Sequence, residues 1–311
     1  MPQTVYKLSQ DTINQMKKHY AKFLTTPPQG AVFRAKTPEA VITAYKSGKV
    51  MFQGAAPDKA SQKWVTEAVT SYKSVNHKRQ PSAHGFAPDP TLFAKNHIGT
   101  DEAGTGDYFG PITVAGVYLN KQQIQQLQDI GVTDSKALTD AKIRQLASTI
   151  MKLQIPYSLL ILHNEKYNQL QKKGWSQGKM KAMLHQHVIG NLVKKIGNVS
   201  LEGIVIDQFC EPAIYQRHIR SENLSLISNT YFLTKAESYS TPVAAGSIIA
   251  RASFLKEMDS LSEQVGIELP KGASKKVDQT IAKIINANGE SILHKLAKTH
   301  FANTKKARNY L

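Results

Sequence analysis

The sequence predicts an α/β domain built on a central sheet, preceded by a smaller α+β unit. From Ile98 onward, short apolar runs typical of buried strands alternate with segments of helical periodicity. Between residues 76 and 91 both patterns are absent, and three prolines stand among scattered polar residues. We therefore divide the chain into a first domain at 1–75, a linker at 76–95 and a second domain at 96–311.

The first domain combines strand and helix patterns. Alternating residues in "TVYKLS" predict a strand, and apolar residues at helical spacing predict a helix over 11–24, with Asp11 as a candidate N-cap. Strands are also expected in "AVFRAKT" and "KVMFQG", with a helix that begins at Pro38 between them. A last helix is expected over 58–73 because its apolar residues share one face.

The second domain alternates apolar strands with longer amphipathic segments. Strands are predicted in "PITVAGVYL", "SLLILHNE" and "GIVIDQF". Helices are predicted over 139–151, 176–196 and 242–258. The segment 291–307 predicts a terminal helix with a basic tail.

Basic residues dominate the charge of the chain. Forty Lys and Arg stand against 23 Asp and Glu, and residues 1–80 alone carry 13 basic and four acidic residues. A basic surface binds polyanions because binding releases counterions from phosphates. Nucleic acid is the partner that this charge favours, although charge alone leaves a membrane surface open. The first domain is then either a nucleic-acid clamp or a solubilising surface.

The sequence shows no feature of a membrane or secreted protein. No apolar run approaches the roughly 18 residues of a membrane-spanning helix, and the first residues, "MPQTVYKLSQD", lack the apolar core of a signal peptide. A single cysteine, Cys210, excludes an internal disulfide and fits a reducing compartment. We expect a cytoplasmic monomer with no membrane partner.

Four acidic residues occupy positions where a basic protein has little general reason to place negative charge. Asp101 and Glu102 precede a glycine turn at 104–106 that leads into an apolar strand. Asp207 ends the strand pattern "GIVID", where a charge is costly unless it is solvated, paired or bound to a metal. Glu237 stands just before a helix whose small residues permit close packing on a sheet.

The four acids form a donor set of hard oxygen atoms. Such a set, without histidine or cysteine, favours Mg²⁺ or Mn²⁺ over zinc. Two such ions about 4 Å apart activate a water and stabilise the leaving oxygen in phosphodiester hydrolysis. Surface acids that cap a turn are the alternative for Asp101 and Glu102. Four histidines show no zinc spacing and are expected mostly at the surface: His163, His185, His187 and His294.

These segments resemble the type 2 ribonucleases H. "DEAGTGDYFGP" is similar to the family's opening motif, and "TDSKAL" at 133–138 is similar to its second block. "GIVID" resembles the strand of the third carboxylate, and "KAESYSTPVAAGSIIARASF" resembles the fourth carboxylate with its helix. The blocks follow the family's order and cover most of residues 98–258. The resemblance implies an RNase H-like catalytic domain with a central mixed sheet and flanking helices.

Two departures from ribonuclease HII indicate similarity to ribonuclease HIII. Thr105 stands where ribonuclease HII usually has arginine, and Glu237 stands where it usually has aspartate. The extra first domain is also similar to ribonuclease HIII, and it implies a TATA-binding-protein-like α+β fold that binds substrate.

The resemblance implies an activity and a cofactor. The activity is endonucleolytic cleavage of the RNA strand of RNA/DNA hybrids by a two-metal carboxylate mechanism, which leaves 5′-phosphate and 3′-hydroxyl ends. The cofactor is Mg²⁺, with Mn²⁺ as a substitute, and no small-molecule cofactor is expected. Two alternatives stay open: cleavage at single ribonucleotides in duplex DNA, as in ribonuclease HII, and hybrid binding without catalysis.

The resemblance also implies roles for individual residues. The carboxylates expected to bind metal and carry catalysis are Asp101, Glu102, Asp207 and Glu237. The residues expected to contact the RNA strand or its phosphates are Gly104, Thr105, Gly106, Ser135, Lys136, Lys235 and Ser247. Glycine lets the backbone approach the RNA closely, and the Thr105 hydroxyl can hydrogen-bond to a 2′-OH.

Overall fold

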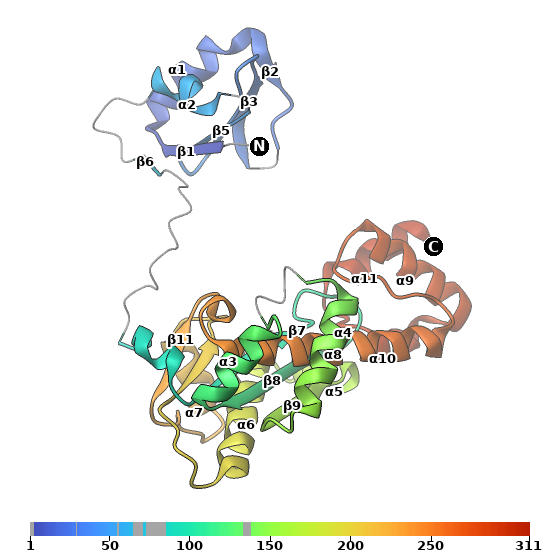
Figure 1. Ribbon diagram of the computed structural model, residues 1–311. Coiled ribbons are helices and arrows are strands. Elements are labelled where there is room, and N and C mark those ends of the chain that lie inside the picture. The colour runs from blue at the N-terminus through green and yellow to red at the C-terminus, as the bar shows by residue number, and fades with distance from the viewer. Residues whose placement is uncertain (1–2, 29, 55, 65–70, 73–84, 133–137) are drawn as a thin grey trace. The chain divides into compact units, whose positions relative to one another are not determined.

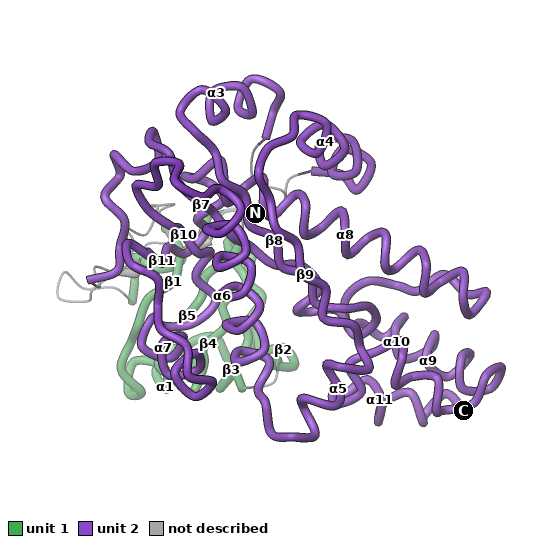
Figure 2. The backbone as a smooth tube through the Cα atoms, turned by 90° about the horizontal axis from the view of Figure 1, so that it is seen from below, with its two compact units in different colours: residues 1–80 green, residues 81–311 purple. Residues whose placement is uncertain are grey.

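The chain divides into two compact units, residues 1–80 and 81–311 (Figure 2). The computed structural model describes most of each unit. The described ranges are 3–28, 30–54, 56–64, 71–72, 85–132 and 138–311.

The first unit is an antiparallel sheet that buries one face under helices. Its strands pair in the order β2-β3-β4-β5-β1-β6. The strands are β1 (Gln3–Lys7), β2 (Leu24–Thr25), β3 (Ala31–Lys36), β4 (Val41–Tyr45), β5 (Lys49–Gln53) and β6 (Ser71–Tyr72), and the helices are α1 (Gln10–His19) and α2 (Pro57–Gln62). Ile13 and Met16 of α1 pack on Phe33, Ile42 and Phe52 of the sheet.

Helix α1 begins one residue before the segment 11–24 that its periodicity predicts, and it ends at His19, within that segment. Its N-cap is Ser9, whose hydroxyl accepts a hydrogen bond from the Thr12 amide, so the expectation of Asp11 at this position is wrong. Asp11 lies in the first turn, where its negative charge interacts favourably with the positive end of the helix dipole.

The expectation of a helix at Pro38 is wrong, because this segment is a turn that leads into strand β4. The Thr37 amide and hydroxyl both donate to the Ala40 carbonyl, and Pro38 takes a turn position that suits its fixed φ. Strand β4 then pairs with both β3 and β5. Tertiary pairing thus outweighs a local signal that proline shares between helix starts and turns.

The last helix of this unit is shorter than the segment 58–73 over which it is predicted. Helix α2 ends at Gln62, and Ser71 and Tyr72 pair with β1 as strand β6. Residues 65–70 and 73 of the expected helix lie outside the described residues.

The second unit is a mixed five-stranded sheet between two layers of helices (Figure 1). The strand order is β11-β10-β7-β8-β9, with β11, β10 and β7 parallel and β8 antiparallel to both β7 and β9. The strands are β7 (His97–Ala103), β8 (Ile112–Leu119), β9 (Tyr157–Leu162), β10 (Gly203–Asp207) and β11 (Thr230–Leu233). Three of them match the apolar runs that predict strands.

Helices cover both faces of this sheet. The helices of the second unit are α3 (Lys121–Asp129), α4 (Asp140–Lys152), α5 (Asn164–Lys172), α6 (Gln177–Ile196), α7 (Pro212–Arg220), α8 (Thr241–Val265), α9 (Lys275–Asn288), α10 (Leu293–Leu296) and α11 (Ala302–Lys306). Helices α6 and α7 share an apolar core with one sheet face, whereas α8 and α4 share another with the opposite face. The helices expected over 139–151 and 176–196 are confirmed, and the one expected over 242–258 continues to Val265.

The single terminal helix expected over 291–307 is wrong, because the chain leaves helical geometry between α10 and α11. Ala297 is extended and forms an isolated bridge with Phe109, and the Lys298 amide donates to the Tyr108 carbonyl. These bonds join the C-terminal segment to the loop between β7 and β8. Figure 1 shows α8 running along the sheet toward this C-terminal region.

Helix α8 lies unusually close to the sheet. A Cβ atom added at Gly99 of β7 would lie 2.1 Å from the Val243 amide nitrogen, and one at Gly246 of α8 would lie 2.9 Å from the Ala115 carbonyl oxygen. Both contacts are to backbone, which cannot move as the tip of a side chain does. The sequence signal of small residues in this helix therefore corresponds to direct backbone packing.

We predict that Gly99→Ala lowers the free energy of unfolding of the second unit by about 3 kcal/mol, because the new methyl forces α8 away from β7. Chemical denaturation followed by circular dichroism measures the change. Gly190→Ala is the matched control, since nothing lies within 4 Å of a Cβ there, and alanine favours its helix by up to about 1 kcal/mol. A Gly99→Ala protein as stable as the wild type would contradict the packing argument.

Candidate active site

Asp101 and Glu102 are neighbours in β7 whose side chains face opposite sides of the sheet, as strand alternation requires. Asp101 faces α8 and is 5% exposed. Its carboxylate accepts hydrogen bonds from the Glu102 amide, at 2.7 Å, and from the Ser247 hydroxyl. Burial, followed by the charges of Asp207 and Glu102, raises the pKa of Asp101 well above its usual range.

Asp207 reaches the same side of the sheet because of strand register. In the parallel pair of β10 and β7, Ile206 lies opposite Thr100, so the next residue of each strand is an aspartate. Asp207 Oδ1 accepts a hydrogen bond from the Ala236 amide at 2.8 Å. The fold therefore brings two repelling carboxylates side by side: Asp207 at the end of β10, and Asp101 two residues before the end of β7.

Glu237 directly follows this contact in the chain. It lies in the turn Ala236–Ser238 between β11 and α8 and is 4% exposed. It also lines a cavity of about 340 Å³ with Gln128 and Thr241. The same turn therefore contains Glu237 and the Ala236 amide that donates to Asp207.

Glu102 points to α6, on the other face of the sheet. Lys181 Nζ donates to its Oε1 at 2.8 Å, and His185 Nε2 lies 3.0 Å from its Oε2. Burial alone would raise the pKa of Glu102, but the hydrogen bonds and charges of His185 and Lys181 outweigh burial and lower the pKa. Glu102 is therefore held as a carboxylate.

Sequence reasoning missed the part played by Lys181 and His185. His185 was expected at the surface but is fully buried, so that expectation is wrong for this residue. The available signal was their i, i+4 spacing, which places them on one face of the predicted helix 176–196. Which face turns toward the sheet becomes clear only from the packing.

The glycine turn after β7 contains one structural glycine and one that the fold does not need. Gly104 has φ +87°, and a Cβ there would lie 2.2 Å from the Pro111 carbonyl oxygen. Nothing lies within 4 Å of a Cβ at Gly106. Between them, the Thr105 carbonyl accepts from Gln177 Nε2, whereas the buried Thr105 hydroxyl has no hydrogen-bond partner within the described part of the chain.

The other residues expected to contact the RNA strand differ in their exposure to solvent. Lys235 is exposed, with a left-handed φ of 58°. Ser247 is buried against Asp101, so its hydroxyl supports the carboxylate. Ser135 and Lys136 lie outside the described residues.

A buried lysine that sequence reasoning also missed fixes the loop after the glycine turn. Lys298 is fully buried, and its Nζ donates to the carbonyls of Asp107, at 2.8 Å, and Gly110, at 2.6 Å. Burial lowers the pKa of Lys298 to about 7. The Gly272 amide donates to Asp107 Oδ1 from the same C-terminal region. The glycine turn is thereby anchored to elements distant in the sequence.

The donor set of this site fits a hard divalent cation. Within the described ranges, no three or more histidine, cysteine, aspartate or glutamate side chains stand in an arrangement that could hold a metal ion. Buried Asp101 and partly buried Asp207 nevertheless bring negative charges together, and a divalent cation would relieve their repulsion. Carboxylate and hydroxyl oxygens are also the ligands that Mg²⁺ and Mn²⁺ prefer.

Comparison with known proteins places the chain in a family. Residues 98–304 match the family model "Ribonuclease HII", and residues 3–77 match "Domain of unknown function (DUF3378)". Ribonuclease HIII of Oceanobacillus iheyensis is 56% identical over all of both chains. Ribonuclease HIII of Bacillus subtilis is 48% identical over 99% of this chain and 97% of its own.

Solved structures agree with these matches. Bst-RNase HIII in complex with Mn²⁺ is 41% identical, with a TM-score of 0.68 over 99% of this chain and 98% of its own. The ribonuclease H2 of Pyrococcus horikoshii OT3 is 21% identical, with a TM-score of 0.55 over 69% of this chain and 97% of its own, which shows the fold alone.

The fold and the matches define an RNase H-like enzyme, a hydrolase, with a TATA-binding-protein-like first unit. Within that class the chain belongs to the ribonuclease HII family and, by its full-length relatives, to ribonuclease HIII. No helix in the described part of the chain is long and apolar enough to cross a membrane.

We predict that Asp101→Asn raises the free energy of unfolding of the metal-free protein by about 1–2 kcal/mol, because it removes a buried charge that neighbouring acids repel. The folded state raises the pKa of Asp101. It therefore binds this proton more tightly than the unfolded chain does, and stability is lost as pH rises through the folded pKa. The advantage of asparagine should grow from acid to neutral pH.

Denaturation at several pH values, with a chelator present, measures this effect. Asp259→Asn is the control, because Asp259 is an exposed partner of Arg144, and its loss should change stability by less than about 1 kcal/mol. An Asp101→Asn protein less stable than the wild type at neutral pH would contradict the proposed charge repulsion.

Proposed function

We propose that this enzyme hydrolyses the RNA strand of RNA/DNA hybrids internally and leaves 5′-phosphate and 3′-hydroxyl ends. The observation that carries the proposal is the pair formed by buried Asp101 and partly buried Asp207, which lie side by side near the C-terminal ends of adjacent parallel strands. We propose Asp101, Glu102, Asp207 and Glu237 as the catalytic and metal-binding carboxylates. The Mn²⁺ in Bst-RNase HIII, a relative of similar fold and length, supports a divalent cation here, Mg²⁺ or Mn²⁺.

The protein's own groups prepare the site for this chemistry. Ser247 and the Glu102 amide hold Asp101 in place by hydrogen bonds, and the Ala236 amide holds Asp207. When bound, two divalent cations would supply an activated water and stabilise the leaving oxygen. Because these side chains are fixed by packing, little rearrangement of the carboxylates is needed at the moment of reaction.

The glycine turn is suited to recognise the RNA strand. Open space at Gly106 lets a sugar-phosphate backbone approach the protein main chain. Because the Thr105 hydroxyl is buried, we propose that Thr105 contributes backbone groups of the turn, which can contact a 2′-OH, the group that distinguishes RNA from DNA. Lys235 is exposed beside Glu237 and suits a phosphate contact, and we propose Gly104, Ser135, Lys136 and Ser247 as further contact or supporting residues.

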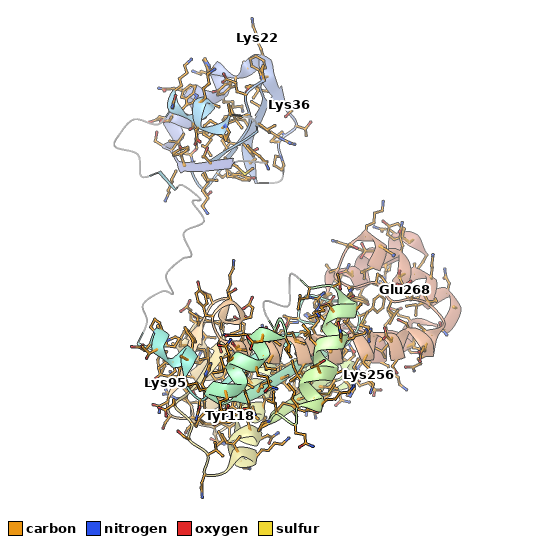
Figure 3. All side chains as sticks on the ribbon, in the orientation of Figure 1. Lys22, Lys36, Lys95, Tyr118, Lys256 and Glu268 are labelled. Atoms are coloured by element: carbon orange, nitrogen blue, oxygen red, sulfur yellow. The ribbon has the colours of Figure 1, made fainter. Side chains whose placement is uncertain are left out.

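The first domain, residues 1–75, is proposed to bind the hybrid and to be tethered by residues 76–95 to a catalytic domain at 96–311. The sheet face opposite the helices supports this role. Arg34 and Lys36 alternate with buried Phe33 and Ala35, so their exposed side chains lie on that face. Figure 3 labels Lys36 among the side chains of this unit.

We further propose that the enzyme acts in the cytoplasm as a monomer. Cys210 is half-buried, and burial raises the pKa of its thiol to about 11. A thiol that stays protonated is a poor nucleophile for disulfide exchange, so Cys210 is expected to stay reduced.

Cleavage of an end-labelled RNA strand paired with DNA tests the proposed reaction. We predict internal cuts with Mg²⁺, none with EDTA, and loss of cutting in Asp101→Asn with hybrid binding largely retained. Asp259→Asn should cut like the wild type. A duplex with a single embedded ribonucleotide, run in parallel, separates the proposed activity from ribonuclease HII-like cleavage.

Two results would overturn this proposal in different ways. Full Mg²⁺-dependent cleavage by Asp101→Asn would refute the catalytic assignment. Tight hybrid binding without cutting under either Mg²⁺ or Mn²⁺ would identify a binding protein instead.

The proposed role of the first domain predicts a change in salt dependence. Removal of residues 1–80 should weaken hybrid binding and flatten the decline of affinity with salt, because fewer phosphates are neutralised. Loss of two charges on the open sheet face, Arg34→Ala with Lys36→Ala, should reduce the log–log salt slope by about 1–2.

The control removes two exposed charges from helix α1 instead, Lys17→Ala with Lys18→Ala. Both pairs lower the net charge by two, so only the binding face distinguishes them. Fluorescence anisotropy at several salt concentrations gives both slopes. Equal effects of the two pairs, or an unchanged slope after truncation, would contradict binding through the sheet face.

A further inference from the structure

Glu102 is held at both carboxylate oxygens by one helix. Lys181 and His185 stand one turn apart on α6 and reach Oε1 and Oε2 at 2.8 and 3.0 Å. Lys181 is only 7% exposed and His185 is fully buried. Burying a lysine and a histidine costs desolvation energy, which their contacts with the Glu102 carboxylate offset.

Both ring nitrogens of His185 have a polar partner. The Thr100 hydroxyl lies 2.8 Å from Nδ1, while Nε2 faces Glu102. Nε2–H can donate to the carboxylate, and the second ring nitrogen is occupied by the Thr100 hydroxyl, so both ring nitrogens have a partner. Thr100, two positions before Glu102 in β7, thereby fixes the His185 ring that supports the Glu102 carboxylate.

Phe209 closes this cluster from the side of β10. Its ring centroid lies 4.1 Å from Lys181 Nζ and 5.2 Å from the His185 ring centroid. The Lys181 ammonium therefore lies between a carboxylate and an aromatic face, where water is excluded and both attractions are strengthened. Lys181 has few alternative positions, so Glu102 is held rigidly.

A carboxylate held in this way can still bind a metal. Each oxygen accepts one hydrogen bond from α6 and retains a second lone pair. Carboxylates that bind metals are commonly oriented by such hydrogen bonds, and loss of the partner weakens metal binding or activity by about 10–100-fold. Lys181 also compensates part of the negative charge that gathers beside Asp101.

We propose that Lys181 and His185 are positioning residues that hold Glu102 ready for the divalent cation, an inference that rests on the metal role of Glu102 in the proposed function. They do not act on the substrate. Their effect is therefore expected in metal affinity, whereas the affinity for the hybrid should be unchanged.

Titration of the full-length chain with Mn²⁺, without nucleic acid, tests this directly by calorimetry or by the electron paramagnetic resonance of free Mn²⁺. Lys181→Met should weaken Mn²⁺ binding by about 10–100-fold, and Lys181→Arg should restore most of it. Lys195→Met is the control. Lys195 lies on the same helix, about 21 Å farther along its axis, and its Nζ donates to the Tyr157 carbonyl.

A double-mutant cycle shows whether Lys181 acts through Glu102. In a Glu102→Gln background, Lys181→Met should have no further effect on Mn²⁺ binding. An additive effect would place Lys181 in another role. Unchanged or tighter Mn²⁺ binding by the single variant would overturn the proposal, and tighter binding would mean that Lys181 competes with the cation.

Two further measurements keep the result interpretable. If circular dichroism shows that Lys181→Met does not fold, Lys181→Gln removes the charge while it retains a hydrogen-bond donor, and the same loss of affinity is expected. Wild-type cleavage is measured in parallel. Metal-dependent cutting with Mn²⁺ affinity insensitive to Lys181 refutes this inference alone, whereas a wild type that neither cuts nor binds Mn²⁺ refutes the proposed function as well.

Discussion

The close contact between helix α8 and strand β7 is the constraint on which the site depends. Gly99 leaves no room for a side chain beneath the Val243 amide, and Gly246 makes a similar contact with the Ala115 carbonyl. One helical turn beyond Val243, Ser247 meets Asp101. The absence of side chains at two glycines therefore sets the position of a hydroxyl against a buried acid. The same packing excludes water from Asp101 and makes its charge costly.

Strand alternation separates two adjacent acids into two environments. Asp101 lies under α8 beside Asp207, where burial and repulsion raise its pKa, whereas Glu102 lies under α6, where Lys181 and His185 lower the pKa. A bound cation would thus stabilise the Asp101 carboxylate, whereas the Glu102 carboxylate already has the Lys181 ammonium beside it. Pairs of titratable groups whose environments separate their pKa values are typical of catalytic sites.

The parts of the fold that sequence predicts are those with strong local periodicity. Strands β8 and β10 are continuous apolar runs, and α4 and α6 repeat apolar residues at helical spacing. Strand β4 was missed because Pro38 suits a turn as well as a helix start. The prediction of a single terminal helix was wrong because Ala297 and Lys298 bond to a loop nearly 190 residues earlier in the chain. No local sequence pattern encodes such pairing.

The residues of the candidate site also fall into those that a local motif predicts and those that only the packing reveals. Motifs located Asp101, Asp207 and Glu237, since each stands at the end or start of a recognisable element. Lys181 and Lys298 were missed because their significance comes from burial, which depends on packing between distant segments. A lysine on an amphipathic helix is most often solvated, so the sequence alone favours the wrong environment for both.

Anomalous scattering from a crystal of this enzyme soaked in Mn²⁺ shows where the fold binds a divalent cation, and so whether Asp101 and Asp207 form a metal site. We predict a Mn²⁺ peak within bonding distance of both Asp101 and Asp207, on the α8 side of the sheet. Saturating Mn²⁺ with no peak between these two carboxylates, and ordered ions only elsewhere, would contradict it.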